Sequence, residues 1–299
     1  MRRGAVRYIM RRLLTAALLV FIVSSAAFVL ARAAPGDHLS GFDVDPAYAA
    51  AERRRLGLDR PILEQYASWL SRGVRLDFGE SLRFRRPVAA LVGERAGNTA
   101  VLGASALLLA TVVGIPLGVL SGSGRGPLPS IVGGISLLML SIPSLVTSLL
   151  LLVADMRWRP DLPRLVLPAL ALALPITALL ERLQSQSMGE ALAEPSIAAA
   201  VARGIPSRRV VWRHGLRLSL KPVLAIYGII VGGVLSGSFV VEVVLDWPGL
   251  GDLMYEALIA RDLYLVAGCA AAVSGFLAAG ILAADLAVIA VDPRIESGS

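Results

Sequence analysis

The chain alternates between long apolar runs and shorter polar segments, and this alternation is its strongest signal. The apolar runs lie at residues 8–31, 98–121, 130–153, 163–180, 222–245 and 265–291. Each approaches the roughly 20 apolar residues that a helix needs to cross the hydrocarbon core of a bilayer. The pattern therefore predicts an all-α polytopic membrane protein with about six transmembrane helices.

Two of these runs need separate arguments. Pro163, Pro168 and Pro175 punctuate the fourth run, which stays compatible with a kinked helix because neighbouring helices can satisfy the freed carbonyls. The first run follows several arginines and resembles a secretory signal, but its apolar stretch is too long and LARAAPGD is only a passable cleavage site. We expect a retained membrane anchor.

Composition supports the membrane interpretation, with 56% hydrophobic residues, 17% charged residues and a mean hydropathy of +0.71. The net charge of +7 is split among loops that flank the apolar runs, so it indicates topology and argues against nucleic acid as a partner. The single cysteine, Cys269, lies in an apolar run and is expected to be a small packing residue.

Arginine and lysine in the short loops predict the orientation. Five arginines lie among the first twelve residues, and residues 181–221 carry seven cations against three acids, so both termini are expected in the cytoplasm. Residues 32–97 must then lie outside, despite eleven arginines, because a loop this long is largely exempt from the rule. The expected parts are 1–31 (N-terminus and first helix), 32–97 (small external domain), 98–291 (five-helix domain with a cytoplasmic loop at 187–221) and 292–299 (cytoplasmic tail).

Residues that several function classes require are missing. The middles of the runs hold almost no ionisable side chains, and Glu242 and Asp285 lie near run ends, which disfavours an ion-coupled transporter. No phosphate-binding loop occurs around the only lysine, Lys221. His38 and His214 are expected on opposite sides of the membrane, so neither a metal site nor a histidine-based catalytic set is expected. A channel, a scaffold or a pore driven by a partner remains.

The loop at residues 190–220 is typical of helix, turn and helix. Pro195 suits a first helical position, Arg203 complements the negative end of that helix, and Gly204 suits a left-handed cap. Ser207 is expected to cap a second helix that begins at Arg208. Two stripes with four-residue spacing follow on that helix, Arg209, Arg213, Arg217 and Lys221 on one side and Trp212, Leu216 and Leu220 on the other.

Periodicity alone leaves two interpretations of this loop open. The second helix could lie among lipid headgroups, with arginines on phosphate and Trp212 at the interface. The short alanine-rich helix in front of it would then have no role. A bare helix with small side chains can instead enter a groove on another protein.

A family resemblance favours the second interpretation. The loop EALAEPSIAAAVARGIPSRRVVWRHGLRLSLKPVL resembles the EAA loop of ABC importer permeases, with Glu190, Ala191 and Gly204 on its E, A and G positions. Further segments resemble the permease branch for dipeptides, oligopeptides and nickel, in family order over nearly the whole chain. They are APGD at 34–37, LGLDRPILEQYASWL at 56–70, LDFGESLRFRRPV at 76–88, GIPLGVLSG at 114–122, LPALALALP at 167–175, WPGLGDLMYEALIARDLYLV at 247–266 and DPRI at 292–295.

The resemblance implies the type I ABC importer permease fold and three sets of site residues. The short helix would dock into a cytoplasmic ATPase through Glu190, Ala191, Ala199, Ala202, Arg203, Gly204, Arg208 and Arg209. Gly232, Gly233, Ser236 and Ser238 would line the pathway, although small residues at this spacing also indicate close helix packing. Asp252, Glu256 and Asp262 would contact a binding protein, although they could equally be solvated charges.

It also implies partners. A second homologous permease, expected in a heterodimer, two ATPase subunits that bind ATP and Mg²⁺, and an extracytoplasmic binding protein would complete the assembly in the bacterial inner membrane, among its lipids. The chain itself is expected to bind no cofactor or metal and to catalyse no reaction. The cargo stays open among dipeptides, longer peptides, nickel complexes and glutathione-like molecules, and a passive channel, a lipid-binding scaffold or a membrane enzyme are the rivals.

Three departures from the family pattern stand out. Ala198 and Val201 occupy positions that carry arginine in the family's docking helix, so the electrostatic part of docking is expected to be weak or specific to one ATPase. The link at residues 154–162 is short, and Lys221 precedes Pro222 where the family commonly has an apolar residue.

Overall fold

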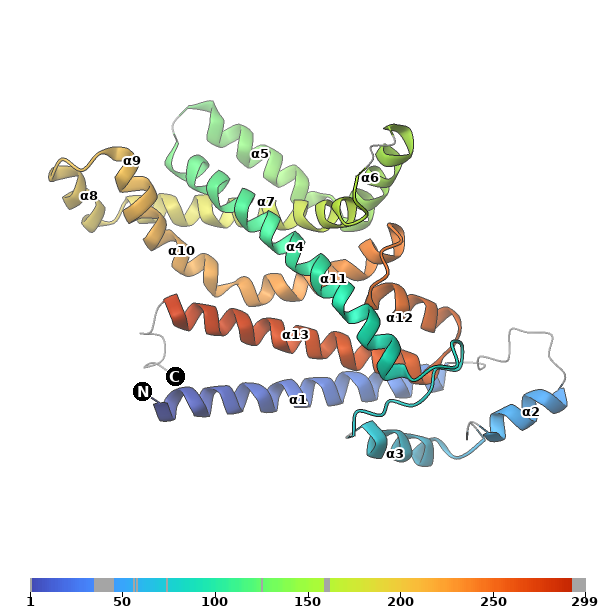
Figure 1. Cartoon of the computed structure of the whole chain (residues 1–299). Coiled ribbons are helices and arrows are strands. Elements are labelled where there is room, and N and C mark those ends of the chain that lie inside the picture. Colours follow the sequence, from blue (N-terminus) through green and yellow to red (C-terminus); the bar gives the residue numbers. More distant parts are fainter. Residues whose placement is uncertain are drawn as a thin grey trace. The chain divides into compact units, whose positions relative to one another are not determined.

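A computed structural model describes residues 2–34, 46–55, 57, 59–73, 75–124, 126–158 and 162–291. Within these residues the chain is helical, and the only extended pairing is an isolated bridge between Glu80 and Pro87 (Figure 1). The helices are α1 (Arg2–Ala33), α2 (Pro46–Arg55), α3 (Ile62–Gly73), α4 (Val88–Ser123), α5 (Pro127–Ser141), α6 (Ser144–Trp158), α7 (Val166–Leu192), α8 (Pro195–Ala202), α9 (Ser207–Arg209), the π-helical segment η1 (Val210–Gly215), α10 (Leu216–Ala225), α11 (Tyr227–Val244), α12 (Leu250–Ile259) and α13 (Leu263–Val291).

The predicted all-α polytopic class is confirmed. Five helices, α1, α4, α7, α11 and α13, are long and apolar enough to cross a membrane, and the bent pair α5 and α6 makes a sixth span if it counts as one. The fourth predicted span, 163–180, lies in α7 from Val166 onward, and this helix accommodates Pro175 without a break. Predicted tail residues 292–299 and His38 lie outside the described residues.

Two predicted spans differ in detail from the helices that contain them. The run at 130–153 is not one straight helix, because α5 and α6 meet at an angle of 99°. Ile142 is extended there, since a residue before proline avoids the helical region, and Pro143 has no N–H to continue the helix. The helix that contains the second predicted span, α4, begins earlier, at Val88, because Glu94 and Arg95 interrupt the apolar run without interrupting the helix.

The chain divides into two compact units, called here unit 1 (Met1–Tyr8, Ala100–Trp247 and Ala279–Ser299) and unit 2 (Ile9–Thr99 and Pro248–Ala278). In unit 2, α3 packs on α1 through an aromatic cluster. Phe28 lies 5.7 Å from Tyr66 and 5.1 Å from Trp69, measured between ring centroids. The Tyr66 hydroxyl lies 2.8 Å from Ser25 Oγ, so a hydrogen bond also joins this cluster to α1.

Small residues at four-residue spacing run along α4 within unit 1. Ala106 and Ala110 belong, with Leu102 one turn before them, to a buried core that α7, α10 and α11 share. The stripe continues through Gly114, Gly118 and Gly122, and a Cβ atom at any of these glycines would contact the backbone of α7, at Thr177, Glu181 and Ser185 respectively. Such stripes let helix backbones approach closely in membranes, so glycine is required for the contact of α4 with α7.

Candidate functional site

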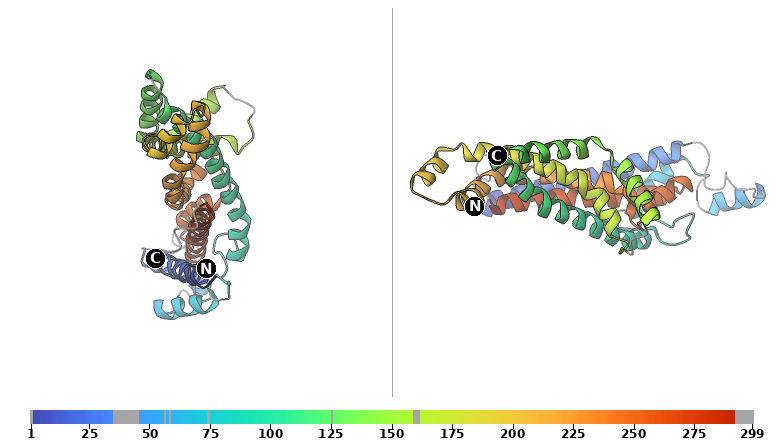
Figure 2. Two further views of the ribbon diagram at one scale, coloured as in Figure 1. Left: turned by 90° about the vertical axis from the view of Figure 1, so that its left-hand side faces the viewer. Right: turned by 90° about the horizontal axis from the view of Figure 1, so that it is seen from above.

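The short helix α8 presents a face of small side chains. Pro195 lies in its first turn, as predicted, and Ile197 and Ala200 are buried at 4% and 2% exposure. Ala199 and Ala202, on the other side, are exposed. In Figures 1 and 2, α8 and α9 project from one end of α7. This arrangement holds a bare helical surface away from the core of unit 1.

Gly204 ends α8 with the predicted left-handed turn. Its φ is +77°, a region that disfavours side chains. The N–H of Gly204 bonds to Val201 O and that of Ile205 to Ala200 O, which together form a Schellman motif. Arg203 Nε donates to Ala199 O at 3.2 Å, so this guanidinium satisfies the negative end of the helix as predicted.

The second helix of the loop differs from its prediction. Pro206 is the capping residue and Ser207 is already helical, so the predicted N-cap at Ser207 is wrong by one residue. The chain then forms the π-helical segment η1, which sequence propensity does not reveal. A π turn holds more residues than an α turn, so a four-residue repeat such as Arg209, Arg213 and Arg217 drifts less around the axis than it would on an α-helix.

The residues predicted to dock the ATPase fall into two groups. Ala191 is buried at 6% exposure and helps to hold the loop. The other members of the set, Glu190, Ala199, Ala202, Arg203, Gly204, Arg208 and Arg209, are exposed on unit 1. Their role in docking stays a prediction.

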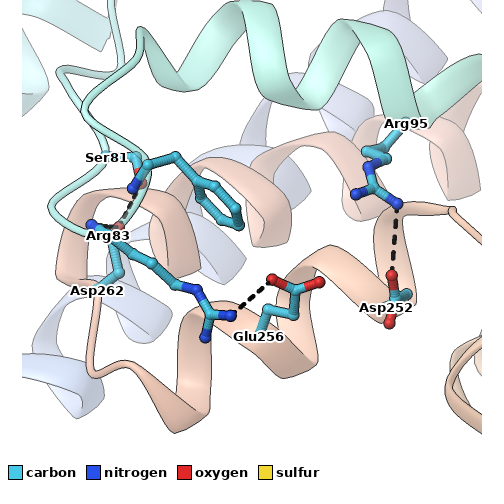
Figure 3. A network of polar contacts seen from close by, with 7 residues as sticks. Ser81, Arg83, Arg95, Asp252, Glu256 and Asp262 are labelled. Carbon is cyan, nitrogen blue, oxygen red and sulfur yellow. Dashed lines mark hydrogen bonds and ion pairs between the residues drawn. The ribbon is translucent and has the colours of Figure 1, made fainter.

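The three acids predicted to contact a binding protein all bond to residues 81–95 in unit 2 (Figure 3). Arg95 Nη1 lies 3.4 Å from Asp252 Oδ2, and Arg83 Nη2 lies 3.2 Å from Glu256 Oε2. Asp262 is fully buried and accepts hydrogen bonds from Ser81 Oγ at 2.6 Å, from the Arg83 N–H and from the Leu265 N–H. The external segments 56–88 and 247–262 are therefore tied together, and binding-protein contact stays a prediction.

A further arginine of the external segment is also paired. Arg86 donates to Glu94 on α4, and this hydrogen bond raises the pKa of Arg86 above its ordinary value. Arg86 therefore stays charged at any physiological pH.

Asp262 and Glu256 offer a test of this network. Asp262→Ala is expected to destabilise the protein by about 3 kcal/mol, because it leaves buried donors without an acceptor. Glu256→Gln is expected to cost less than about 1 kcal/mol, because its ion pair is partly exposed. Thermal unfolding of the two variants in detergent measures the difference. Equal midpoints for both would contradict the structural role of Asp262.

The predicted pathway residues of α11 do not share one face. Ser238 is buried at 3% exposure and its hydroxyl donates to Leu235 O within its own helix. Gly233 and Ser236 are exposed, and Gly232 is partly buried. Of these four residues only Gly233 and Ser236 are exposed, and their role in lining a pathway stays a prediction.

Polar residues that the sequence interpretation missed lie buried beneath the loop. Ser121 Oγ of α4 donates to Glu181 Oε1 of α7, and Gln184 Nε2 donates to Ser219 Oγ of α10 at 2.7 Å. The spacing of Glu181, Gln184 and Met188 on one helical face was the available signal.

Comparisons with known proteins identify the family of the chain. Residues 114–297 match the family described as binding-protein-dependent transport system inner membrane component, and residues 5–91 match the N-terminal region of such membrane components. The chain belongs to this family. The permease is 33% identical to the oligopeptide transport system permease protein AppB of Bacillus subtilis, over 97% of this chain and 99% of that protein.

Two other relatives carry different names. The permease is 31% identical to the oligopeptide transport system permease protein OppB of Salmonella typhimurium, over 97% of this chain and 99% of that protein. It is 32% identical to the glutathione transport system permease protein GsiC of Escherichia coli K12, over 85% of this chain and 87% of that protein. The permease is therefore a multi-pass membrane component of an ABC importer, a class that works with separate ATPase and substrate-binding proteins.

Proposed function

We propose that this permease forms one half of the transmembrane pathway of an ATP-driven importer of peptides. The observation that carries the proposal is the exposed small-residue face of α8, ended by the Schellman motif at Gly204, in a chain similar to oligopeptide permeases over 97% of its length. Both termini and α8 lie in the cytoplasm, because the charged loop belongs to the positive side of the membrane. In bacteria this is the inner membrane.

The proposed mechanism is alternating access driven from outside the chain. Two ATPase subunits bind ATP and Mg²⁺, and their closure moves α8. The contact must be stronger in one ATPase state than in the other, because equal affinity for both states shifts no equilibrium. The permease then rearranges its spans and catalyses no reaction itself. It needs no cofactor or metal of its own for this role.

The pathway and the outer surface complete the proposal. In the proposed assembly Gly233 and Ser236, which are exposed on α11, supply width and a hydroxyl to the pathway. A second homologous permease forms the opposite wall, in a heterodimer. The paired external segments of unit 2 receive the binding protein with its cargo. Asp252 and Glu256 are partly exposed on these segments, while Asp262 is buried beneath them.

Cargo is tested by uptake into vesicles that contain the permease pair, the ATPases and the binding protein. Labelled dipeptide and oligopeptide are expected to accumulate when ATP is present, and unlabelled peptide is expected to compete. Glutathione is the second candidate, because one relative bears that name. Competition by glutathione or by a nickel complex, without competition by peptide, would contradict a peptide cargo.

A further inference from the structure

Two helical segments of unit 1 form a stalk beneath α8. We define the stalk as residues 181–192 of α7 together with η1 and α10. The apolar part of α7 ends at Leu180, and the helix continues to Leu192, about 18 Å further at 1.5 Å per residue. The chain then passes through α8 and returns through η1 and α10 towards α11. Any movement of α8 must therefore reach the spans through two separate helices.

The two helices of the stalk interlock at buried side chains. Gln184 of α7 and Ser219 of α10 are both 0% exposed, and Gln184 Nε2 donates to Ser219 Oγ at 2.7 Å. Met188, one turn further along α7, is also 0% exposed, and its sulfur lies 3.6 Å from Ser219 Oγ. It fills the space beside Gly215, where a Cβ atom would lie 2.6 Å from Met188 Cε. The contact therefore fixes the register of α7 against α10.

The same face of α7 is tied to α4. Glu181 is 2% exposed and accepts from Ser121 Oγ of α4. Gly118 of α4 packs on Gln184, with an added Cβ at 2.6 Å from Gln184 Cβ. Glu181 Oε2 and Gln184 Oε1 have no hydrogen-bond partner among the described residues. Buried acceptors without a hydrogen-bond donor lower the stability of the fold, because they have lost their contacts with water. Apolar side chains of the same size would pack here without this loss of stability.

We propose that Gln184, Ser219 and Met188 are positioning residues that lock α7 to α10, so that a displacement of α8 moves both helices together. The hydrogen bond from Gln184 to Ser219 and the Met188 side chain beside Gly215 together oppose sliding of the two helices. Without the lock, α8 follows the ATPase while the two helices slip, and ATP is hydrolysed without transport. This inference rests on the proposed function and adds the element that transmits the movement.

The test uses the whole complex in vesicles and compares Gln184→Met, Ser219→Ala and the double variant. Methionine is close to glutamine in length and volume, and it removes the hydrogen bond. Each single variant is expected to raise the ATP hydrolysed per cargo imported by about fivefold, and the double variant to raise it no further, because both remove the same link. The amount of ATPase bound is expected to stay unchanged. Ser274→Ala is the matched control for Ser219→Ala, since Ser274 is also buried and its hydroxyl donates to backbone carbonyls of its own helix, α13.

Two results would overturn the lock. In the first, the amount of assembled complex and the uptake fall by the same factor, and the ATP hydrolysed per cargo imported is unchanged. This result would mean that the variants only lower the stability of the permease. The other is a double variant whose effect is the product of the single effects. If the unmodified complex shows no ATP-dependent uptake, the proposed function fails instead, so the two failures are distinguishable.

Discussion

Gly204→Trp is expected to abolish both ATPase association and cargo uptake while leaving membrane insertion intact. The backbone at Gly204 has a φ of +77°, which costs a residue with a side chain about 1 to 2 kcal/mol. No heavy atom lies within 4 Å of an added Cβ, so the indole would project from the end of α8 without disturbing the core of unit 1. The change therefore alters the proposed docking surface and spares the spans. Co-purification with the ATPase and vesicle uptake measure both effects.

Gly204→Asn is the control for backbone geometry. Asparagine tolerates the left-handed region and adds little bulk, so this variant is expected to keep most ATPase association. A tryptophan variant that transports normally would contradict the docking role of α8. If the asparagine variant lost ATPase association and uptake as completely as the tryptophan variant, the docking contact would require glycine at this position in addition to the left-handed turn.

Gly122→Ala is expected to destabilise the protein by about 3 kcal/mol, because the added methyl group has no free space between the packed helices α4 and α7. A Cβ at this position would overlap the Ser185 carbonyl oxygen of α7, and it would lie 2.8 Å from Met188 Cβ. Backbone cannot move aside as a flexible side chain can. Thermal unfolding in detergent is expected to show a lower midpoint.

Gly134→Ala is the matched control on α5. No heavy atom lies within 4 Å of an added Cβ there, and alanine is a better helix former than glycine by about 1 kcal/mol. Replacing glycine with alanine is therefore expected to lower the free energy of unfolding at Gly122 and to raise it at Gly134. Destabilisation of similar size at both would contradict the close contact between α4 and α7.

The sequence predicted helices well where hydropathy alone determines them, and less well where packing does. Apolar runs located α1, α7, α11 and α13, and the glycine at 204 predicted its own turn. The start of α4 at Val88 was missed because Glu94 and Arg95 are polar, although both find partners in unit 2. The sharp bend at Pro143 was missed because a proline marks a break without giving its angle.

The candidate site was predicted only in part, because some of its contacts depend on packing between distant segments. The loop could be placed because its turn residues act locally. The buried pairs Ser121 with Glu181 and Gln184 with Ser219 join residues 60 and 35 positions apart, so no local pattern links them. The burial of Asp262 likewise depends on Ser81, which is 181 positions away in the chain.

The central claim is that force enters the permease through α8 from a separate ATPase. The most direct measurement is cargo uptake by vesicles that contain the permease pair, the binding protein and ATP, with the ATPase subunits either present or omitted. We predict ATP-dependent accumulation with the ATPase and none above background without it. Accumulation at the full rate in vesicles that lack the ATPase would contradict the account.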